Sequence, residues 1–219
     1  MKVARTPALS ALIVFFITEF SSPSLAQAGD DSQLAEGARV FDTIAGVGCK
    51  TCHGEYAEGD VGVGPYIRGA TEGMIRAAID ATDAMVVITS VITDDEVKAV
   101  AAYLGHLGTM QAVRTLAKRG RFLPDEISVR PGTNVQLIVQ NASMQEHTFK
   151  SDNMAIDDLV IAGRSSGNLK WSAPESEGEF SLYCTNCKLK DQLFVVKVDA
   201  SAAPFRQVVP AGNAANSTM

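Results

Sequence analysis

The sequence contains 219 residues, of which 46% are apolar and 20% are charged, and its formal net charge is -6. That length accommodates one large or two small domains, and the composition is that of an ordinary globular protein. The acidic balance argues against nucleic acid as a partner, because phosphate binding needs clustered basic charge, and it is compatible with a basic redox partner.

Residues 1–28 have the pattern of an export signal peptide. Lys2 and Arg5 precede an apolar run from Ala8 to Ile17, and small residues at 26–28 offer a cleavage site. The run is too short to cross a bilayer, which needs about 20 apolar residues, so no membrane span is predicted in the mature chain. An uncleaved N-terminal anchor is the alternative. Export predicts a periplasmic location, where cysteine pairs form disulfides unless another group binds them.

Four further segments follow the signal peptide. Residues 29–110 are rich in glycine and alanine, with helical periodicity at both ends. Residues 111–120 are rich in basic side chains, as expected of a short helical linker with a solvated face. Residues 121–199 alternate apolar and polar positions and are rich in valine, phenylalanine and threonine. Residues 200–219 lack periodicity and are predicted to be a disordered tail.

Two helices are predicted to bracket a glycine-rich middle in the first domain. Leu34–Ile44 places apolar residues three and four positions apart, which is the spacing of a helix face. Thr93 begins a second helix with a capping box, because its side chain accepts from free amides while Glu96 reaches back. A unit of about 80 residues has a marginal core, so a large apolar cofactor would complete it.

The second domain is predicted to be an all-β sandwich, so the fold class is an all-α domain followed by an all-β one. Residues 127–129 and 135–139 alternate apolar and polar residues on either side of the turn at 130–133, which predicts a hairpin. Residues 178–183 and 193–198 provide two later strands. Several short strands in about 80 residues are typical of a sandwich.

Cys49-Lys50-Thr51-Cys52-His53 is the attachment motif of c-type haem. Two thiols add to the vinyl groups on one edge of the porphyrin, so they must lie a few residues apart, and the next imidazole is held beneath the iron. The sequence therefore predicts one covalent haem c on Cys49 and Cys52, with His53 as an axial iron ligand. A chance histidine after a plain thiol pair is the alternative, and the helix before the motif and the glycine-rich loop after it argue against that interpretation.

The sixth iron ligand must come from a residue downstream of this motif. Met74 begins a predicted helix, and His106 and Met110 follow the last helix, which is expected along the haem edge. Met85 lies in a predicted loop just before Thr93, where the chain can cross the open haem face. Met85 is therefore assigned as the second axial ligand, since methionine with histidine is an arrangement found in cytochromes c.

Several positions around the motif carry a family resemblance, namely Gly37, Phe41, Gly54, the loop at 62–66 and Tyr103-Leu104. With these features, residues 33–108 resemble class I cytochromes c, an all-α family of electron carriers. The resemblance implies that the Pro65 carbonyl accepts from the His53 ring and fixes its orientation. It also implies a close crossing of the first and last helices at Gly37. The family usually has proline after its methionine ligand, where this sequence has Val86.

The second domain has its own matching positions, namely the segments at 122–124, 127–133, 141–147 and 177–184 and the closing valine-rich strand. With these, residues 121–199 resemble cupredoxins. In that family two histidines, a cysteine and a weak methionine hold a blue copper. The resemblance implies His147 as the first histidine and Cys184 as the thiolate. Cys187 and Lys190 stand where the family has its second histidine and its methionine, and a protonated lysine would repel copper.

Four interpretations of Cys184 and Cys187 stay open from the sequence. In the first, copper or another thiophilic metal binds both sulfurs and His147, with Met144 as a further ligand, since thiolates suit Cu(I). In the second, the pair is a disulfide in a metal-free domain. The third is a two-copper centre like that of oxidase subunit II, although the spacing differs. The fourth is a second haem site with Lys188 as the iron ligand, which the β context disfavours.

The sequence thus predicts an exported electron carrier and not an enzyme. Single electrons would pass through one haem between a protein donor and a protein acceptor, and Met85 would leave no iron position for a substrate. The chain could also be a subunit of a larger oxidoreductase or membrane redox complex in which the sandwich serves for docking. The competing function is copper handling or thiol redox sensing by Cys184 and Cys187.

Overall fold

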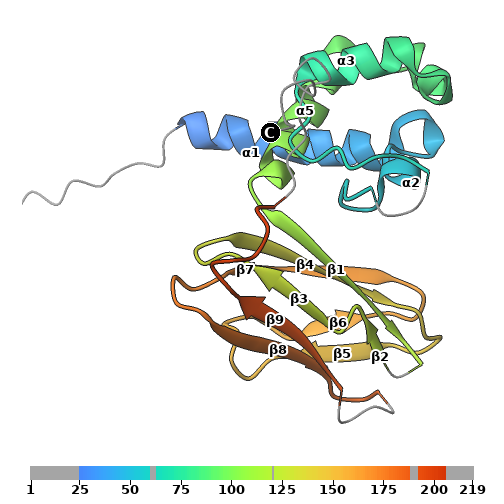
Figure 1. The fold of residues 1–219 in the computed structure, drawn as a ribbon. Helices are drawn as coiled ribbons and strands as arrows, with labels where there is room; N and C mark the ends of the chain where they lie inside the picture. The colour runs from blue at the N-terminus through green and yellow to red at the C-terminus, as the bar shows by residue number, and fades with distance from the viewer. Residues whose placement is uncertain (1–24, 60–62, 120, 188–191, 206–219) are drawn as a thin grey trace, which may run out of the picture.

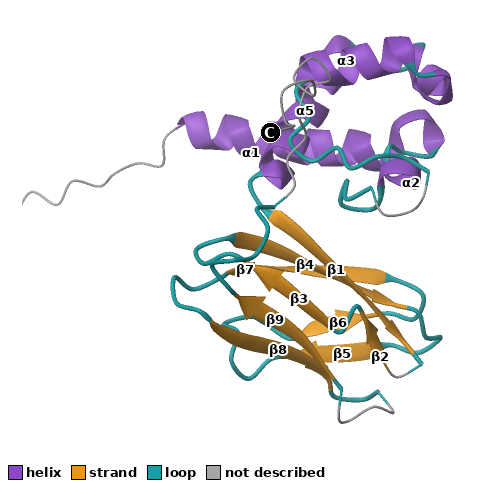
Figure 2. Ribbon diagram, in the orientation of Figure 1, coloured by secondary structure: helices purple, strands orange, loops and turns teal. Residues whose placement is uncertain are grey.

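The structure is a computed structural model, and it describes residues 25–59, 63–119, 121–187 and 192–205. A helical unit comes first and a two-sheet sandwich follows, with the last helix leading into the first strand (Figure 1). Figure 2 shows that helices and strands are segregated between the two units. The predicted signal peptide falls mostly outside the described residues. Within the described ranges, no helix is both long and apolar enough to cross a membrane.

The helical unit is held together by the crossing of its first and last long helices. An added Cβ at Gly37 would overlap the carbonyl oxygen of Ala99, so only glycine permits this approach. The rings of Phe41 and Tyr103 lie 5.6 Å apart at the same crossing. The close crossing implied at Gly37 is therefore present. The helical elements are α1 (Leu25–Thr43), η1 (Ile44–Gly46), α2 (Lys50–His53), α3 (Glu72–Ala81), η2 (Asp83–Met85), α4 (Val86–Thr89) and α5 (Asp94–Gly108).

The capping box predicted at Thr93 is confirmed. The amide of Thr93 donates to the Glu96 carboxylate at 2.9 Å, and the amide of Glu96 donates to the Thr93 hydroxyl at 3.3 Å. Two amides at the start of α5 that have no partner inside the helix are thereby satisfied. The helix then buries Val97, Val100 and Leu104 against α1 and the rest of the helical core.

The predicted loop around Met85 is instead helical. Met85 ends η2, its amide donates to the Thr82 carbonyl at 2.8 Å, and α4 begins at Val86. The prediction was wrong because turns of three or four residues are too short to show an apolar periodicity.

The sandwich consists of a four-stranded and a five-stranded sheet whose inner faces share one core. β1 pairs in parallel with β4, and β3 with β9, while the other neighbours are antiparallel. The first sheet has the order β2 (Arg121–Leu123), β1 (Gln111–Lys118), β4 (Asn134–Asn141), β7 (Ser166–Ser172). The second has the order β3 (Glu126–Val129), β9 (Leu193–Val198), β8 (Gly178–Cys184), β5 (His147–Lys150), β6 (Leu159–Ile161).

Residues 111–120 do not form the predicted helical linker. Gln111–Lys118 is strand β1, which pairs along its length with β4 and buries Val113 and Thr115 completely. The basic side chains that suggested a solvated helix face occupy positions outside this buried alternation of period two. The sandwich therefore begins at Gln111 and not at residue 121.

Two other predictions for the β region need correction. The strands before and after the turn at 130–133 belong to different sheets, so β3 and β4 form no hairpin. Strands that face each other across a sandwich core alternate as hairpin strands do, and local sequence cannot separate the two cases. The predicted tail also begins later than residue 200, because Ala202 is buried and its carbonyl accepts from the Arg130 side chain at 2.7 Å. Residues 206–219 lie outside the described residues.

A buried arginine joins the helical unit to the sandwich. The Arg68 side chain is fully buried and donates to the Leu107 carbonyl at 2.7 Å and to the Gln136 side chain of β4 at 2.6 Å. It also reaches the carbonyls of Tyr56 and Met110 at 3.2 and 3.3 Å. Burial lowers the pKa of the guanidinium. Arg68 thus fixes the loop that follows the haem motif against α5 and β4.

Candidate functional site

The first cysteine pair lies on α2, one turn long. Cys49 is the N-cap residue, and Cys52 and His53 end the helix. The two thiols are unbonded and partly buried. Burial raises the pKa of the Cys49 thiol to about 11, so this sulfur carries its proton near neutral pH.

His53 is buried, and its Nδ1 lies 2.8 Å from the carbonyl oxygen of Pro65. A carbonyl can only accept, so Nδ1 carries the proton and donates it, which leaves the lone pair on Nε2 for a metal. Gly64 permits this approach, because an added Cβ would lie 2.9 Å from Nδ1. The contact that the cytochrome c resemblance implied between His53 and Pro65 is present.

Exposed apolar side chains gather in this unit. Nine large apolar side chains are exposed among the described residues, and five of them fall between positions 47 and 91. A large apolar cofactor that covered these side chains would remove their surface from water. With the paired thiols and the oriented imidazole, this donor set and surface fit a haem. The five residues are Val47, Val63, Val86, Val87 and Val91.

The structure separates the four candidates for a second axial ligand. His106 lies at the junction with the sandwich, where its Nε2 is 3.3 Å from Lys170 Nζ, and Met110 is buried at the same junction. Met74 lies in the first turn of α3. Met85 directly precedes the exposed Val86 and Val87 of α4. Of the four, Met85 is the one adjacent in sequence to exposed apolar side chains.

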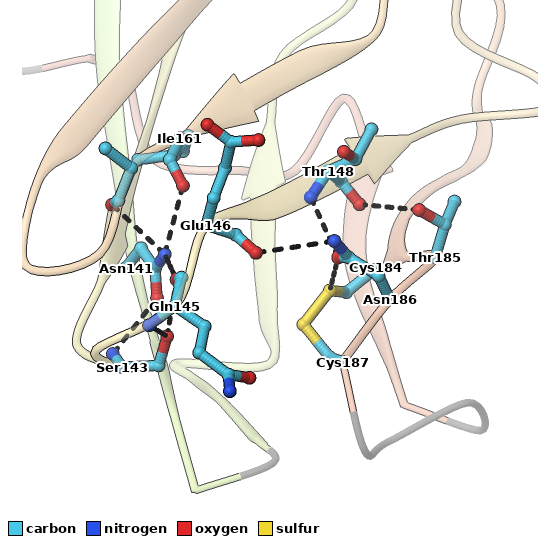
Figure 3. Close-up of a disulfide and its surroundings, with 11 residues drawn as sticks. Asn141, Ser143, Gln145, Glu146, Thr148, Ile161, Cys184, Thr185, Asn186 and Cys187 are labelled. Carbon is cyan, nitrogen blue, oxygen red and sulfur yellow. Dashed lines mark hydrogen bonds between the residues drawn. A yellow bond between two sulfur atoms is a disulfide. The ribbon is translucent and has the colours of Figure 1, made fainter.

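The second cysteine pair ends β8 and is a disulfide, with the two Cα atoms 5.5 Å apart (Figure 3). The ligand atoms of His147, Cys184 and Cys187 all lie within 4.8 Å of one another. The structure therefore brings together the three residues of the predicted copper set. His147 Nδ1 is buried and has no hydrogen-bond partner. A buried nitrogen without a partner is costly in free energy and is a common feature of ligand sites.

The state of the disulfide decides what this cluster can bind. Metals bind thiolates, and a closed disulfide offers none, so only the reduced pair fits copper or another thiophilic ion. Met144 does not complete the set in the structure, since it is 77% exposed and its sulfur contacts Arg164 Nε at 3.1 Å. Lys188, the possible ligand of a second haem, lies outside the described residues. So does Lys190, which stands where cupredoxins have their methionine ligand.

Two asparagines that the sequence analysis left without a role hold the loops of this cluster (Figure 3). Asn186 accepts from the Thr148 amide at 3.0 Å and donates to the Glu146 carbonyl at 3.3 Å, which ties the cysteine loop to the start of β5. The fully buried Asn141 donates to the carbonyls of Gln145 and Ile161 at 2.8 and 3.1 Å. The sequence signal for the role of Asn141 was its position at the end of strand β4. Asparagine side chains form hydrogen bonds with nearby backbone groups at such positions.

Comparison with known proteins identifies the second unit. Residues 97–196 match the family model of the cupredoxin-like domain, so the chain contains a cupredoxin-like β-sandwich. No curated protein matched. Similar solved structures include the metal binding domain of the Cu(I) exporting P-type ATPase CopA of Streptococcus pneumoniae D39, at 16% identity over 42% of this chain and 87% of that chain, with a TM-score of 0.35. Auracyanin A of Chloroflexus aurantiacus is 14% identical over 40% of this chain and 98% of that chain, with a TM-score of 0.36. Scores this low carry no further argument.

Proposed function

We propose that this chain is an exported, periplasmic electron carrier in which residues 49–53 hold one covalent haem c. The observation that carries the proposal is the hydrogen bond from His53 Nδ1 to the Pro65 carbonyl, which leaves Nε2 for iron beside two unbonded thiols. When bound, the haem supplies an iron that changes between two oxidation states. Its electrons would pass between a protein donor and a protein acceptor.

Each residue of the site has a separate task. The sulfurs of Cys49 and Cys52 tether the cofactor, and the His53 ring presents Nε2 in a fixed orientation. The Pro65 carbonyl makes that imidazole a stronger ligand by accepting its other proton. Met85 would close the second face of the iron, so that the site transfers electrons and binds no substrate. Arg68 holds the intervening loop against α5 and β4.

The cysteine requirement tests this proposal. A Cys49→Ala/Cys52→Ala protein, exported from a host that attaches haem, should be purified without bound pigment. The matched control is Cys184→Ala/Cys187→Ala, which has the same two changes in the other pair and should keep the full haem absorbance. Pigment retained by the first variant and lost from the second would contradict the proposal.

The assignment of Met85 has its own spectroscopic test. Met85→Ala should abolish the weak far-red absorption band that arises from sulfur bound to ferric haem iron, while the covalent haem stays in place. Met74→Ala, Met110→Ala and His106→Ala should leave that band unchanged. If the band survives in Met85→Ala, the sulfur ligand of the iron is Met74 or Met110 and not Met85.

A second candidate function is binding of Cu(I) or another thiophilic ion by the reduced second domain, or redox sensing by its thiols. Two observations favour it: a ring nitrogen of His147 and both sulfurs lie within 4.8 Å of one another, and the buried Nδ1 of His147 has no hydrogen-bond partner among the described residues. Reduction breaks the S–S bond and uses two electrons and two protons, which a dithiol reductant would supply. We expect tight Cu(I) binding, measured by competition with a chromophoric chelator, after reduction but not before it. His147→Ala should weaken binding at least tenfold, and equal binding to the oxidised protein would exclude the site.

A further inference from the structure

We propose that the end of the sandwich that carries the Cys184–Cys187 disulfide docks a partner protein through an acidic face of that partner. This basic end consists of Lys118 at the end of β1, Arg119 directly after it, Arg121 at the start of β2, the loops at 141–147 and 162–166, and residues 184–187. The proposal rests on topology and charge. It holds whether or not the cysteines bind a metal.

The topology gathers these segments at one end. β1 and β4 run in parallel away from the helical unit, so Lys118 and Asn141 end their strands at the far end of the sandwich (Figure 1). Ser166 of β7 pairs with Gln140, and His147 of β5 pairs with Ile161, which brings both of the other loops there. Phe149 pairs with Cys184, which adds the disulfide.

The cations of the basic end have no carboxylate partner among the described residues. Lys118, Arg119 and Arg121 are exposed, and none has an ion pair or a side-chain hydrogen bond in the described part of the chain. Lys118 and Arg121 are direct cross-strand partners, an arrangement in which like charges repel. Arg164 adds a fourth exposed cation from the loop at 162–166. Elsewhere in the sandwich, three basic side chains pair with carboxylates, namely Arg114, Lys150 and Lys197.

Carboxylates at the basic end are few. Glu146 is the acidic residue in its described loops. Asp125 and Glu126 lie outside these loops, at the start of β3, and Glu126 is paired with Lys197 at 2.8 Å. The chain as a whole has a net charge of -6, so the basic end is a positively charged region on a negatively charged molecule. A partner attracted to it therefore carries negative charge, because complementary potentials steer association.

Exposed apolar side chains lie among these cations, as they do in protein interfaces. Met144 is 77% exposed and Leu193, at the start of β9, is 47% exposed. The Arg164 guanidinium contacts the Met144 sulfur at 3.1 Å, so a cation and an apolar side chain share one surface. Methionine and arginine are both enriched in protein interfaces. The basic end thus offers apolar contact area as well as charge.

The test uses the full mature protein and a fluorescently labelled poly-L-glutamate peptide as the acidic probe. The variant Lys118→Glu/Arg121→Glu/Arg164→Glu should bind the probe at least tenfold more weakly than the wild type in fluorescence anisotropy. The matched control Arg39→Glu/Arg76→Glu/Lys98→Glu makes the same change of charge in the helical unit, where all three cations are paired with carboxylates. It should change affinity less than twofold. Binding by the wild type should weaken as salt is raised.

Three results would overturn the proposal. The first is an equal loss of affinity in both variants. The second is binding to phosphatidylglycerol vesicles that depends on the three cations while poly-L-glutamate binding does not. The third is concentration-dependent self-association, in gel filtration, that disappears in the basic-end variant, since the occupant would then be a second copy of the chain. The corresponding glutamine variant, Lys118→Gln/Arg121→Gln/Arg164→Gln, replaces the first one if that fails to fold, with a matching glutamine control.

Discussion

The two Cys-x-x-Cys segments of this chain have one spacing and two different surroundings. Cys49 and Cys52 lie on a helical turn and are unbonded, whereas Cys184 ends strand β8 and forms a disulfide with Cys187 in the loop that follows. The adjacent imidazoles differ as well. His53 has its Nδ1 hydrogen-bonded to a carbonyl, while the Nδ1 of His147 is buried without a partner. The chemistry of a thiol pair is therefore set by its neighbouring imidazole as much as by its spacing.

The two units differ in the same way. The sandwich has a complete core in which Phe122 lies 6.0 Å from Phe149 and 5.9 Å from Phe194, ring centre to ring centre. The helical unit instead leaves five valines exposed between positions 47 and 91. A large apolar cofactor bound there would complete its core. This contrast supports the proposed haem on the first pair, and three experiments test it.

The largest expected effect concerns the connection between the units. Arg68→Met would remove the buried donor to the side-chain oxygen of Gln136 and to the carbonyls of Tyr56 and Met110, while the Leu107 carbonyl keeps the Met110 amide at 3.2 Å. Each such loss costs about 1–3 kcal/mol, so we expect the free energy of unfolding to fall by more than about 3 kcal/mol. Urea unfolding followed by the fluorescence of Trp171 and by helical circular dichroism would measure it.

Arg39→Met is the control for that measurement. Arg39 pairs with Glu36 on the surface of α1, and exposed pairs contribute about 0–1 kcal/mol. We expect a change within that range. If Arg68→Met were as mild as this control, the two units would not depend on the buried arginine for their connection.

The second effect contrasts the reactivity of the two cysteine pairs. In the haem-free protein, burial raises the pKa of Cys49 to about 11, so near pH 8 this sulfur has on the order of a hundredfold less thiolate than an ordinary cysteine. Its labelling by iodoacetamide, followed by peptide mass, should be slow and should accelerate up to about pH 11. The same residue in urea-unfolded protein is the control and should label at an ordinary rate. Cys184 and Cys187 should stay unlabelled until a reductant is added. Equal Cys49 rates in folded and unfolded protein would contradict the buried position.

The smallest effect concerns the disulfide. It closes a loop of only about four residues, for which the chain-entropy model gives about 2 kcal/mol. Cys184→Ser/Cys187→Ser should lower the stability of the sandwich by that amount in urea unfolding and leave the haem absorbance unchanged. Thr185→Ser, an exposed change within the same loop, is the control. No loss of stability would indicate that the two sulfurs are reduced in the native protein.

Features encoded by neighbouring residues were predicted from the sequence. Thr93 and Glu96 lie three positions apart and form the predicted capping box. The contact of His53 with Pro65 and the close crossing at Gly37 followed from a family resemblance and are present in the structure. The family model likewise supports a β-sandwich in the second unit. The haem itself and the Met85 ligand remain proposals.

Features that depend on distant residues were missed. Strand β1 was taken for a helical linker because its partner β4 lies beyond two intervening strands in the chain. The false hairpin at 130–133 has the same origin, since alternation shows that a strand is half-buried but not which strand it pairs with. Arg68 gave no signal, because its acceptors on α5 and β4 come together only in the folded chain.

The intact mass of the exported protein, measured after extraction with acidified acetone, tests the central claim most directly. Thioether bonds survive this treatment and coordination bonds do not. We predict the mass of the polypeptide plus one haem, and a mass increase confined to the peptide that contains Cys49 and Cys52. A mass equal to that of the bare polypeptide, with the pigment in the acetone phase, would contradict the account.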